Sequence, residues 1–73
     1  MGKQPAHNRL GDERRKRGWT QDDLAEKSGL DTTAISRYET GAAFPRADNI
    51  DLLAAAFGVT ADKIFRWLRE GAA

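Results

Sequence analysis

Cysteine is absent from the sequence, and histidine occurs only once, at position 7. The lack of cysteine excludes disulfide bridges and cysteine-ligated metal sites. A single histidine leaves a metal site or a histidine-dependent catalytic dyad without partners, and no nucleophile–base pair or pair of acidic residues stands out elsewhere. We therefore expect no metal ion, no other cofactor and no enzymatic activity.

Long apolar segments are also missing. No stretch is long and apolar enough to span a membrane, and residues 1–10 lack the apolar centre of a signal peptide. The expected location is the cytoplasm, without contact with a membrane. The 73 residues suffice for one small domain, and 40% of them are apolar, which is enough for a single core.

Basic residues are concentrated at the start of the chain. Residues 1–20 hold six basic and two acidic side chains, whereas residues 21–73 hold six basic and nine acidic ones. A basic segment beside an acidic remainder suits a protein that offers one face to a polyanion. A basic run such as residues 14–17 is more often a solvated helix face, so the charge pattern alone does not decide the function.

Helix-capping residues and glycines divide the sequence into five short helical segments, without the alternation typical of strands. Thr20 and Asp31 are good N-terminal caps, and glycine follows each of the five segments. The expected helices run over about residues 8–17, 20–28, 31–40, 48–57 and 60–70. We predict an all-α fold, a compact five-helix domain over residues 8–70 between a flexible N-terminal arm (1–7) and a C-terminal tail (71–73).

The segment from Gln21 to Tyr38 has the features of two helices joined by a tight turn. Ala25 is small enough to let a second helix cross closely, Gly29 permits the positive φ angle of a sharp turn, and Ile35 is an apolar anchor. In a helix-turn-helix, the second helix enters the major groove of DNA. An ordinary pair of packed helices has the same spacing, so this pattern does not separate the two interpretations.

A wider set of residues matches a known pattern from Leu10 to about Leu68. These residues are Arg14, Gly18-Trp19-Thr20-Gln21, Leu24-Ala25, Gly29-Leu30, Thr33-Ala34-Ile35-Ser36-Arg37, Tyr38-Glu39, Gly41, Pro45 and Phe57-Gly58-Val59-Thr60. In them the sequence resembles the Cro/repressor family of helix-turn-helix domains, also called the xenobiotic-response-element family. The resemblance implies a sequence-specific DNA-binding regulator of transcription, and we expect a repressor. Glu13 departs from the family, which usually has an apolar residue there, so the first helix is expected to pack more loosely or to start later.

Four residues of the expected third helix are candidates for reading bases. Thr32 and Thr33 occupy its first turn, and Ser36 and Arg37 lie one turn later, on or beside the same face. Threonine hydroxyls hydrogen-bond several base edges, and arginine contacts O6 and N7 of guanine together. The alternatives for Arg37 are a phosphate contact or solvent.

Other residues are expected to contact phosphates, which fixes the register on DNA without reading sequence. Gln21 stands at a helix start, and the resemblance implies that its side chain donates to the DNA backbone. Its alternative is a solvated position at the helix start. The further candidates are Thr40, Ala42, Arg46, Asn8, Arg9 and the tail around Lys3.

Two groups of residues are assigned to structure and assembly. The resemblance implies that Arg14 and Glu39 form an ion pair that holds the third helix at its angle. Phe65, Trp67 and Leu68 offer more apolar area than a small core needs, so we predict a homodimer interface there. The alternative is that Trp67 only closes the core.

A homodimer would place two reading helices about 34 Å apart on a pseudo-palindromic operator. The expected partners are therefore double-stranded operator DNA and a second copy of the chain. The length leaves no room for an effector domain, so no small-molecule effector is expected. Two rival interpretations are a protein-capturing module such as an antitoxin, and an enzyme.

Overall fold

The computed structural model describes residues 8–70, and the predicted arm (1–7, with Lys3) and tail (71–73) lie outside this range. Five helices make up the described part, which contains no strand: α1 (Arg9–Lys16), α2 (Gln21–Ser28), α3 (Thr32–Thr40), α4 (Ala47–Phe57) and α5 (Ala61–Arg69). The predicted all-α fold is confirmed, and each helix begins and ends within one residue of its expected bounds.

Side-chain caps fix the helix starts near the site. At α2, the hydroxyl of Thr20 accepts a hydrogen bond from the backbone N–H of Asp23 (3.0 Å), whose carboxylate accepts one from the N–H of Thr20 (2.9 Å). Asp31 caps α3 through the N–H of Ala34 (2.8 Å). Because these contacts are local, the residues themselves determine where both helices begin.

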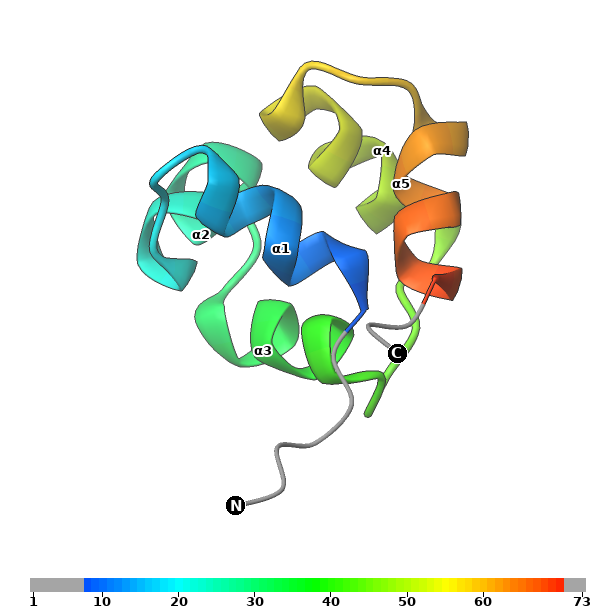
Figure 1. Cartoon of the computed structure of the whole chain (residues 1–73), viewed down its shortest axis with the longest axis horizontal. Coiled ribbons are helices and arrows are strands. Elements are labelled where there is room, and N and C mark those ends of the chain that lie inside the picture. The colour runs from blue at the N-terminus through cyan, green and yellow to red at the C-terminus, as the bar shows by residue number, and fades with distance from the viewer. Residues whose placement is uncertain (1–7, 71–73) are drawn as a thin grey trace.

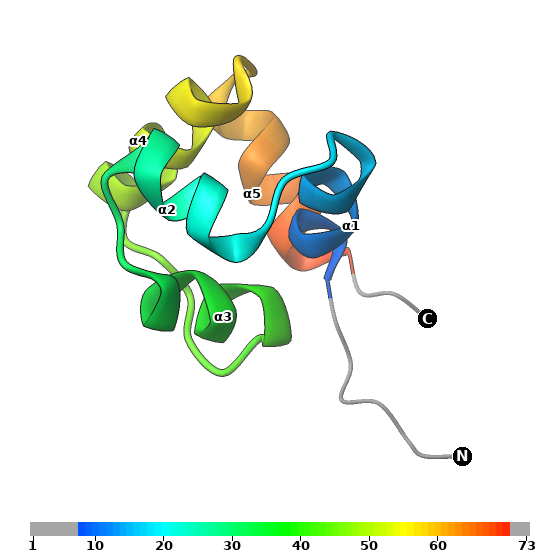
Figure 2. The same ribbon diagram turned by 90° about the vertical axis from the view of Figure 1, so that its left-hand side faces the viewer.

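One apolar core lies between the five helices. Its members are Leu10, Leu24, Ile35, Tyr38, Ile50, Leu53, Ala54, Phe57, Ile64, Trp67 and Leu68. α4 packs against α5 and α2, while α3 packs against α2 and α1. Figures 1 and 2 show α3 at the edge of the molecule, below α2, so one of its sides faces outward.

The connection between α2 and α3 is a tight turn. Gly29 ends α2 with a φ angle of 82°, a left-handed conformation that glycine adopts without a steric penalty. The backbone N–H of Leu30 then donates to the hydroxyl of Ser28 (3.2 Å). Only Gly29–Asp31 separate the two helices, which form the predicted helix-turn-helix.

A buried ion pair holds the inner face of α3. Glu39 is 1% exposed, and the Nε of Arg14 in α1 lies 2.7 Å from its Oε2, with Nη2 3.2 Å from Oε1. Arg14 also donates from Nη1 to the carbonyl of Trp19 (2.7 Å), and Gln21 of α2 donates from Nε2 to Oε1 of Glu39 (3.1 Å). A buried charge is costly unless it is paired and hydrogen-bonded, and this network meets both conditions while joining α1, α2 and α3.

Glycine at position 11 makes room for that network. An ideal Cβ on Gly11 would lie 3.0 Å from Oε1 of Glu39 and 3.3 Å from its Cδ. Both distances are shorter than ordinary carbon contacts, and the Glu39 carboxylate is held too firmly by Arg14 and Gln21 to move aside. The missing side chain therefore lets α1 pass close to α3.

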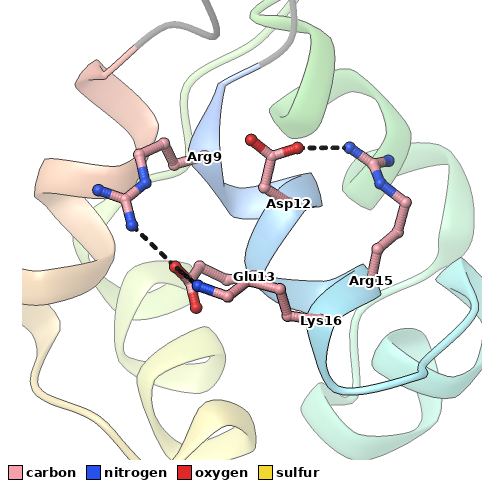
Figure 3. Close-up of a pocket in the computed structure, with 5 residues that line it drawn as sticks. All are labelled: Arg9, Asp12, Glu13, Arg15 and Lys16. Atoms are coloured by element: carbon pink, nitrogen blue, oxygen red, sulfur yellow. Dashed lines mark hydrogen bonds and ion pairs between the residues drawn. The ribbon is translucent and has the colours of Figure 1, made fainter.

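A second charged cluster surrounds Glu13 on α1, where Figure 3 shows Arg9 and Lys16 beside its carboxylate. Nitrogen atoms of Arg9 and Arg17 lie 2.9 Å from this carboxylate, and that of Lys16 lies 3.3 Å away. Burial raises the pKa of Glu13, but hydrogen bonds from Arg17, Arg9 and Lys16 outweigh burial and lower it below its ordinary value. Charge compensation thus accommodates a carboxylate where the family usually has an apolar residue. α1 starts at Arg9, one residue after the start predicted from the sequence.

Removing one member of the buried pair between Arg14 and Glu39 should destabilise the protein far more than removing one member of an exposed ion pair. Arg14→Met and Glu39→Gln should each lower the free energy of unfolding by roughly 3–5 kcal/mol, because each leaves its buried partner uncompensated. The double variant should recover part of the loss. Urea melts measure all three values, with Arg15→Met, an exposed arginine of the same helix, as control. Losses below about 0.5 kcal/mol, as for an exposed pair, would contradict this hold on α3.

Glu13→Gln should make the free energy of unfolding depend less steeply on pH in the acidic range. A carboxylate with a lowered pKa in the folded state stabilises fully above its unfolded pKa, and this contribution disappears as the pH falls through the folded pKa. The unfolding free energy of the wild type should therefore fall more steeply than that of Glu13→Gln from about pH 5 to about pH 2. Melts of Glu26→Gln, an exposed carboxylate on α2, correct for the loss of one negative charge. Parallel curves for the wild type and Glu13→Gln would contradict the compensation at Glu13.

Candidate nucleic-acid interface

α3 presents one face to the core and the opposite face to solvent. Its buried residues are Ile35, Tyr38 and Glu39. The outer face, together with the start of α2, lines one shallow depression formed by Gln21, Thr32, Thr33, Ser36 and Arg37. The structure thus brings together all four residues predicted to read bases and one residue predicted to contact phosphate.

The depression is lined by groups suited to hydrogen bonding with base edges. The hydroxyls of Thr32, Thr33 and Ser36 donate and accept, and a guanidinium offers two parallel donors. Arg37 is exposed, and its guanidinium has no ion-pair partner among residues 8–70. The acidic residue of α3, Glu39, is neutralised on the inner side. The outer face therefore combines uncommitted donors with one unpaired positive charge.

Gln21 has an internal partner that the sequence did not reveal. Its Nε2 donates to Oε1 of Glu39 (3.1 Å), and the residue is half-buried. A glutamine amide has two N–H donors and one carbonyl oxygen, so one donor and the oxygen are left for other contacts. Gln21 thus belongs both to the wall of the depression and to the network that holds α3.

The other predicted phosphate contacts begin at Thr40, the last residue of α3, and continue into the loop that follows it. The hydroxyl of Thr40 donates to the carbonyl of Arg37 (3.3 Å). Ala42 is exposed in the loop, and the side chain of Arg46, 86% exposed, stands at the N-terminal cap of α4. These residues line the path from α3 to α4 and do not take part in the depression itself.

Asn8 and Arg9 are engaged within the protein. Asn8 is buried, with its Nδ2 donating to the carbonyl of Tyr38 (2.7 Å) and its Oδ1 capping α1. Arg9 lies 2.9 Å from both Glu13 and Glu70. The two residues thus fasten the start of α1 to the end of α3 and to the end of α5.

The predicted dimer residues divide between core and surface. Trp67 and Leu68 are buried, 7% and 8% exposed, so Trp67 closes the core. Phe65 is 39% exposed, and its ring packs edge-on against that of Phe44, which is 52% exposed, with 5.6 Å between ring centres. Of the three residues, Phe65 is the one that leaves substantial apolar area exposed at the surface.

A depression on α1 contrasts with the outer face of α3. Figure 3 shows that the charged residues lining it pair with one another: Arg15 lies 2.8 Å from Asp12, while Arg9 and Lys16 contact Glu13. Within residues 8–70, no group of three or more His, Cys, Asp or Glu side chains is placed to share a metal ion. None of the helices described has the length and apolar character needed to cross a bilayer.

Sequence reasoning missed three contacts of this region. They are the close approach at Gly11, the hydrogen bond from Nδ2 of Asn49 to the hydroxyl of Tyr38 (3.0 Å), and the packing of Arg17. The guanidinium of Arg17, part of the basic run 14–17 that is more often a solvated helix face, lies 5.0–5.8 Å from the centres of three aromatic rings. All three join segments that are distant in the sequence, so no local pattern points to them.

Comparisons with known proteins agree with this geometry. A helix-turn-helix family model matches residues 10–64. A hypothetical transcription factor from Neisseria is 36% identical, with a TM-score of 0.69; the match covers 75% of this chain but 62% of that one, less than two thirds of its length. The restriction-modification controller protein C.Esp1396I is 32% identical, with a TM-score of 0.68 and coverage of 82% and 78%. None of the curated proteins compared matches the chain.

The family match spans most of the chain, and the described fold has the turn and the outward helix that this family uses on DNA. The solved structures that resemble it include transcription regulators. The chain therefore belongs to the Cro/repressor family of helix-turn-helix proteins and is a DNA-binding regulator of transcription.

Proposed function

We propose that the protein is a repressor that binds a pseudo-palindromic operator as a homodimer, with α3 in the major groove. The observation that carries this proposal is the division of α3 into two faces. The inner face is fixed by Ile35 in the core and by the Glu39 network, while the outer face holds Arg37, which has no ion-pair partner among residues 8–70. A reading helix that is already fixed loses little freedom on binding, which favours affinity.

The contacts follow from this placement. Thr32, Thr33 and Ser36 face base edges, and Arg37 contacts a guanine through O6 and N7. Gln21 donates its remaining N–H to a phosphate at the start of α2, where the helix dipole favours an anion. The flanking phosphate contacts are Thr40, Ala42 and Arg46, with Arg9 at the periphery. Asn8, predicted from the sequence to contact a phosphate, we instead assign to structure, because both ends of its amide are already hydrogen-bonded within the protein.

Repression would follow from occupancy. A protein that covers part of a promoter blocks polymerase without a further activity, so its concentration sets the response and no small-molecule effector is required. The resemblance to a transcription factor and to a restriction-modification controller protein supports a regulatory role. Such a protein works where the DNA is, which for this chain we take to be the cytoplasm.

The dimer surface that we propose is centred on Phe65. A groove between α4 and α5 is lined by Ala47, Ile50, Asp51, Ala61, Asp62 and Phe65. Phe44 adjoins it, and Arg69 holds its guanidinium 5.5 Å from the Phe65 ring. Apolar area bordered by two acidic residues and an arginine can complement a second copy of itself related by a two-fold axis, with the arginine of one copy near the acidic residues of the other.

Selection of binding sites from random duplex DNA should yield two inverted half-sites, and these then test the roles of Arg37 and Gln21. Arg37→Ala should lose about 1–3 kcal/mol of affinity on the selected operator and flatten the preference at one position of each half-site. Gln21→Ala should weaken binding by a similar factor on every sequence. Both variants are titrated against single-base-pair operator variants at one salt concentration, because affinity depends steeply on salt.

An even loss across all operator variants with Arg37→Ala would make Arg37 a phosphate contact. Base reading would then fall to the hydroxyls of Thr32, Thr33 and Ser36 and to DNA shape. If selection enriches no sequence at all, sequence-specific repression itself is contradicted.

Phe65→Ser should weaken binding to the complete operator, which needs the dimer, much more than binding to an isolated half-site. It removes apolar area worth about 1.5–3 kcal/mol, so affinity for the complete operator should fall about tenfold or more, while affinity for an isolated half-site changes little. Lys63→Ser, an exposed residue of the same helix outside the groove, is the matched control. Sedimentation that finds a monomer both free and on the complete operator would remove the dimer from the proposal.

A further inference from the structure

One side-chain hydrogen bond joins α3 to α4. Nδ2 of Asn49 lies 3.0 Å from the hydroxyl of Tyr38, and no other side-chain hydrogen bond connects these two helices in the described range. α3 packs on α1 and α2, whereas α4 packs on α2 and α5. The contact between Tyr38 and Asn49 is therefore a direct polar link between two helices that pack mainly against other helices.

The two ends of this bond lie in parts of the protein with different roles. Tyr38 follows Arg37 and is itself 8% exposed, turned to the inner side of α3. Asn49 lies in the first turn of α4 and precedes Ile50 and Asp51, which line the proposed dimer groove. The bond thus runs from the helix that faces DNA to the helix that faces the second subunit.

The loop between α3 and α4 provides a second, indirect link, because its contacts reach α3 and α5. The N–H of Ala43 donates to the carbonyl of Arg37 (3.2 Å), and Phe44 rests its ring on Phe65. Apolar contacts tolerate sliding, whereas a hydrogen bond restricts both distance and angle. A buried tyrosine hydroxyl usually needs a hydrogen-bond partner. The amide of Asn49 is that partner, and its hydrogen bond restricts the position of the Tyr38 side chain.

We infer that Asn49 is a positioning residue which, by holding the hydroxyl of Tyr38, sets the orientation of α3 relative to the dimer surface and so the half-site spacing that the dimer accepts. This inference rests on the proposed homodimer. Two reading helices about 34 Å apart must enter successive major grooves together. A change of orientation in each subunit moves the two helices in opposite directions, so it alters the spacing while leaving each half-site contact intact.

The test compares three kinds of duplex made from the sequence that the wild-type protein selects: an isolated half-site, the complete operator, and operators with one base pair added or removed between half-sites. The variants are Asn49→Ala, Tyr38→Phe, their combination, and Asn49→Asp, whose carboxylate accepts a hydrogen bond from the tyrosine. Asp48→Ala changes the neighbouring exposed position of α4 and serves as control. Thermal melts and sedimentation establish that each variant folds and dimerises.

The wild type should prefer the selected spacing. Asn49→Ala should reduce that preference by about fivefold, the value of one ordinary hydrogen bond, with an unchanged affinity for the half-site. Tyr38→Phe should have the same effect, the double variant should add nothing, and Asn49→Asp should restore much of the preference. A role confined to stability would move the melts and leave the ratio between spacings unchanged.

Three outcomes would overturn the inference. If Asn49→Ala keeps the full spacing preference, the bond does not set the spacing. If it weakens binding to every duplex alike, including the half-site, Asn49 contacts the DNA backbone instead. If the wild type itself binds half-site and operator equally, the homodimer proposal has failed and the inference fails with it. The first two outcomes overturn only the inference and leave the homodimer proposal standing.

Discussion

The buried carboxylate of Glu39 is the contact on which the placement of α3 depends. It receives Arg14 from α1 and Gln21 from α2, at distances of 2.7 and 3.1 Å. Desolvation of two charges makes such a pair a weak source of net stability. Its contribution is to fix the relative orientation of α1, α2 and α3, because the pair keeps its hydrogen bonds only if the three helices keep their relative positions. Gly11 is part of the same constraint, since a side chain there would meet the carboxylate.

Which charges remain unpaired tells more about function than how many there are. The net charge is only +1, and the cations of α1 are matched by carboxylates: Arg9 and Lys16 by Glu13, and Arg15 by Asp12. Among residues 8–70, Arg37 has no ion-pair partner on the outer face of α3; Lys27, Lys63, Arg66 and Arg69 have none either, but they do not line that face. Attraction to DNA would therefore come from a few placed groups and not from a broad basic surface, which suits a protein that must discriminate among sequences.

Local chemistry made much of the fold predictable. Caps at Thr20 and Asp31 and the left-handed turn at Gly29 act within a few residues, so the helix bounds followed from the sequence alone. The hydrogen bond from Gln21 to Glu39 and the one between Asn49 and Tyr38 join distant segments and could not be foreseen. Counting apolar residues on the last helix suggested a surplus, but a count does not show that Trp67 and Leu68 are needed to fill the core.

The central claim is that the outer face of α3 reads DNA, and amide chemical shifts test it most directly. The wild-type protein is labelled with nitrogen-15 and titrated with the duplex that it selects from random DNA. The account predicts that the largest shift changes occur at residues 32–37 and at Gln21, while Lys63 and its neighbours on the far side of α5 change little. Unchanged shifts in α3 and at Gln21, with changes concentrated in other helices, would contradict it.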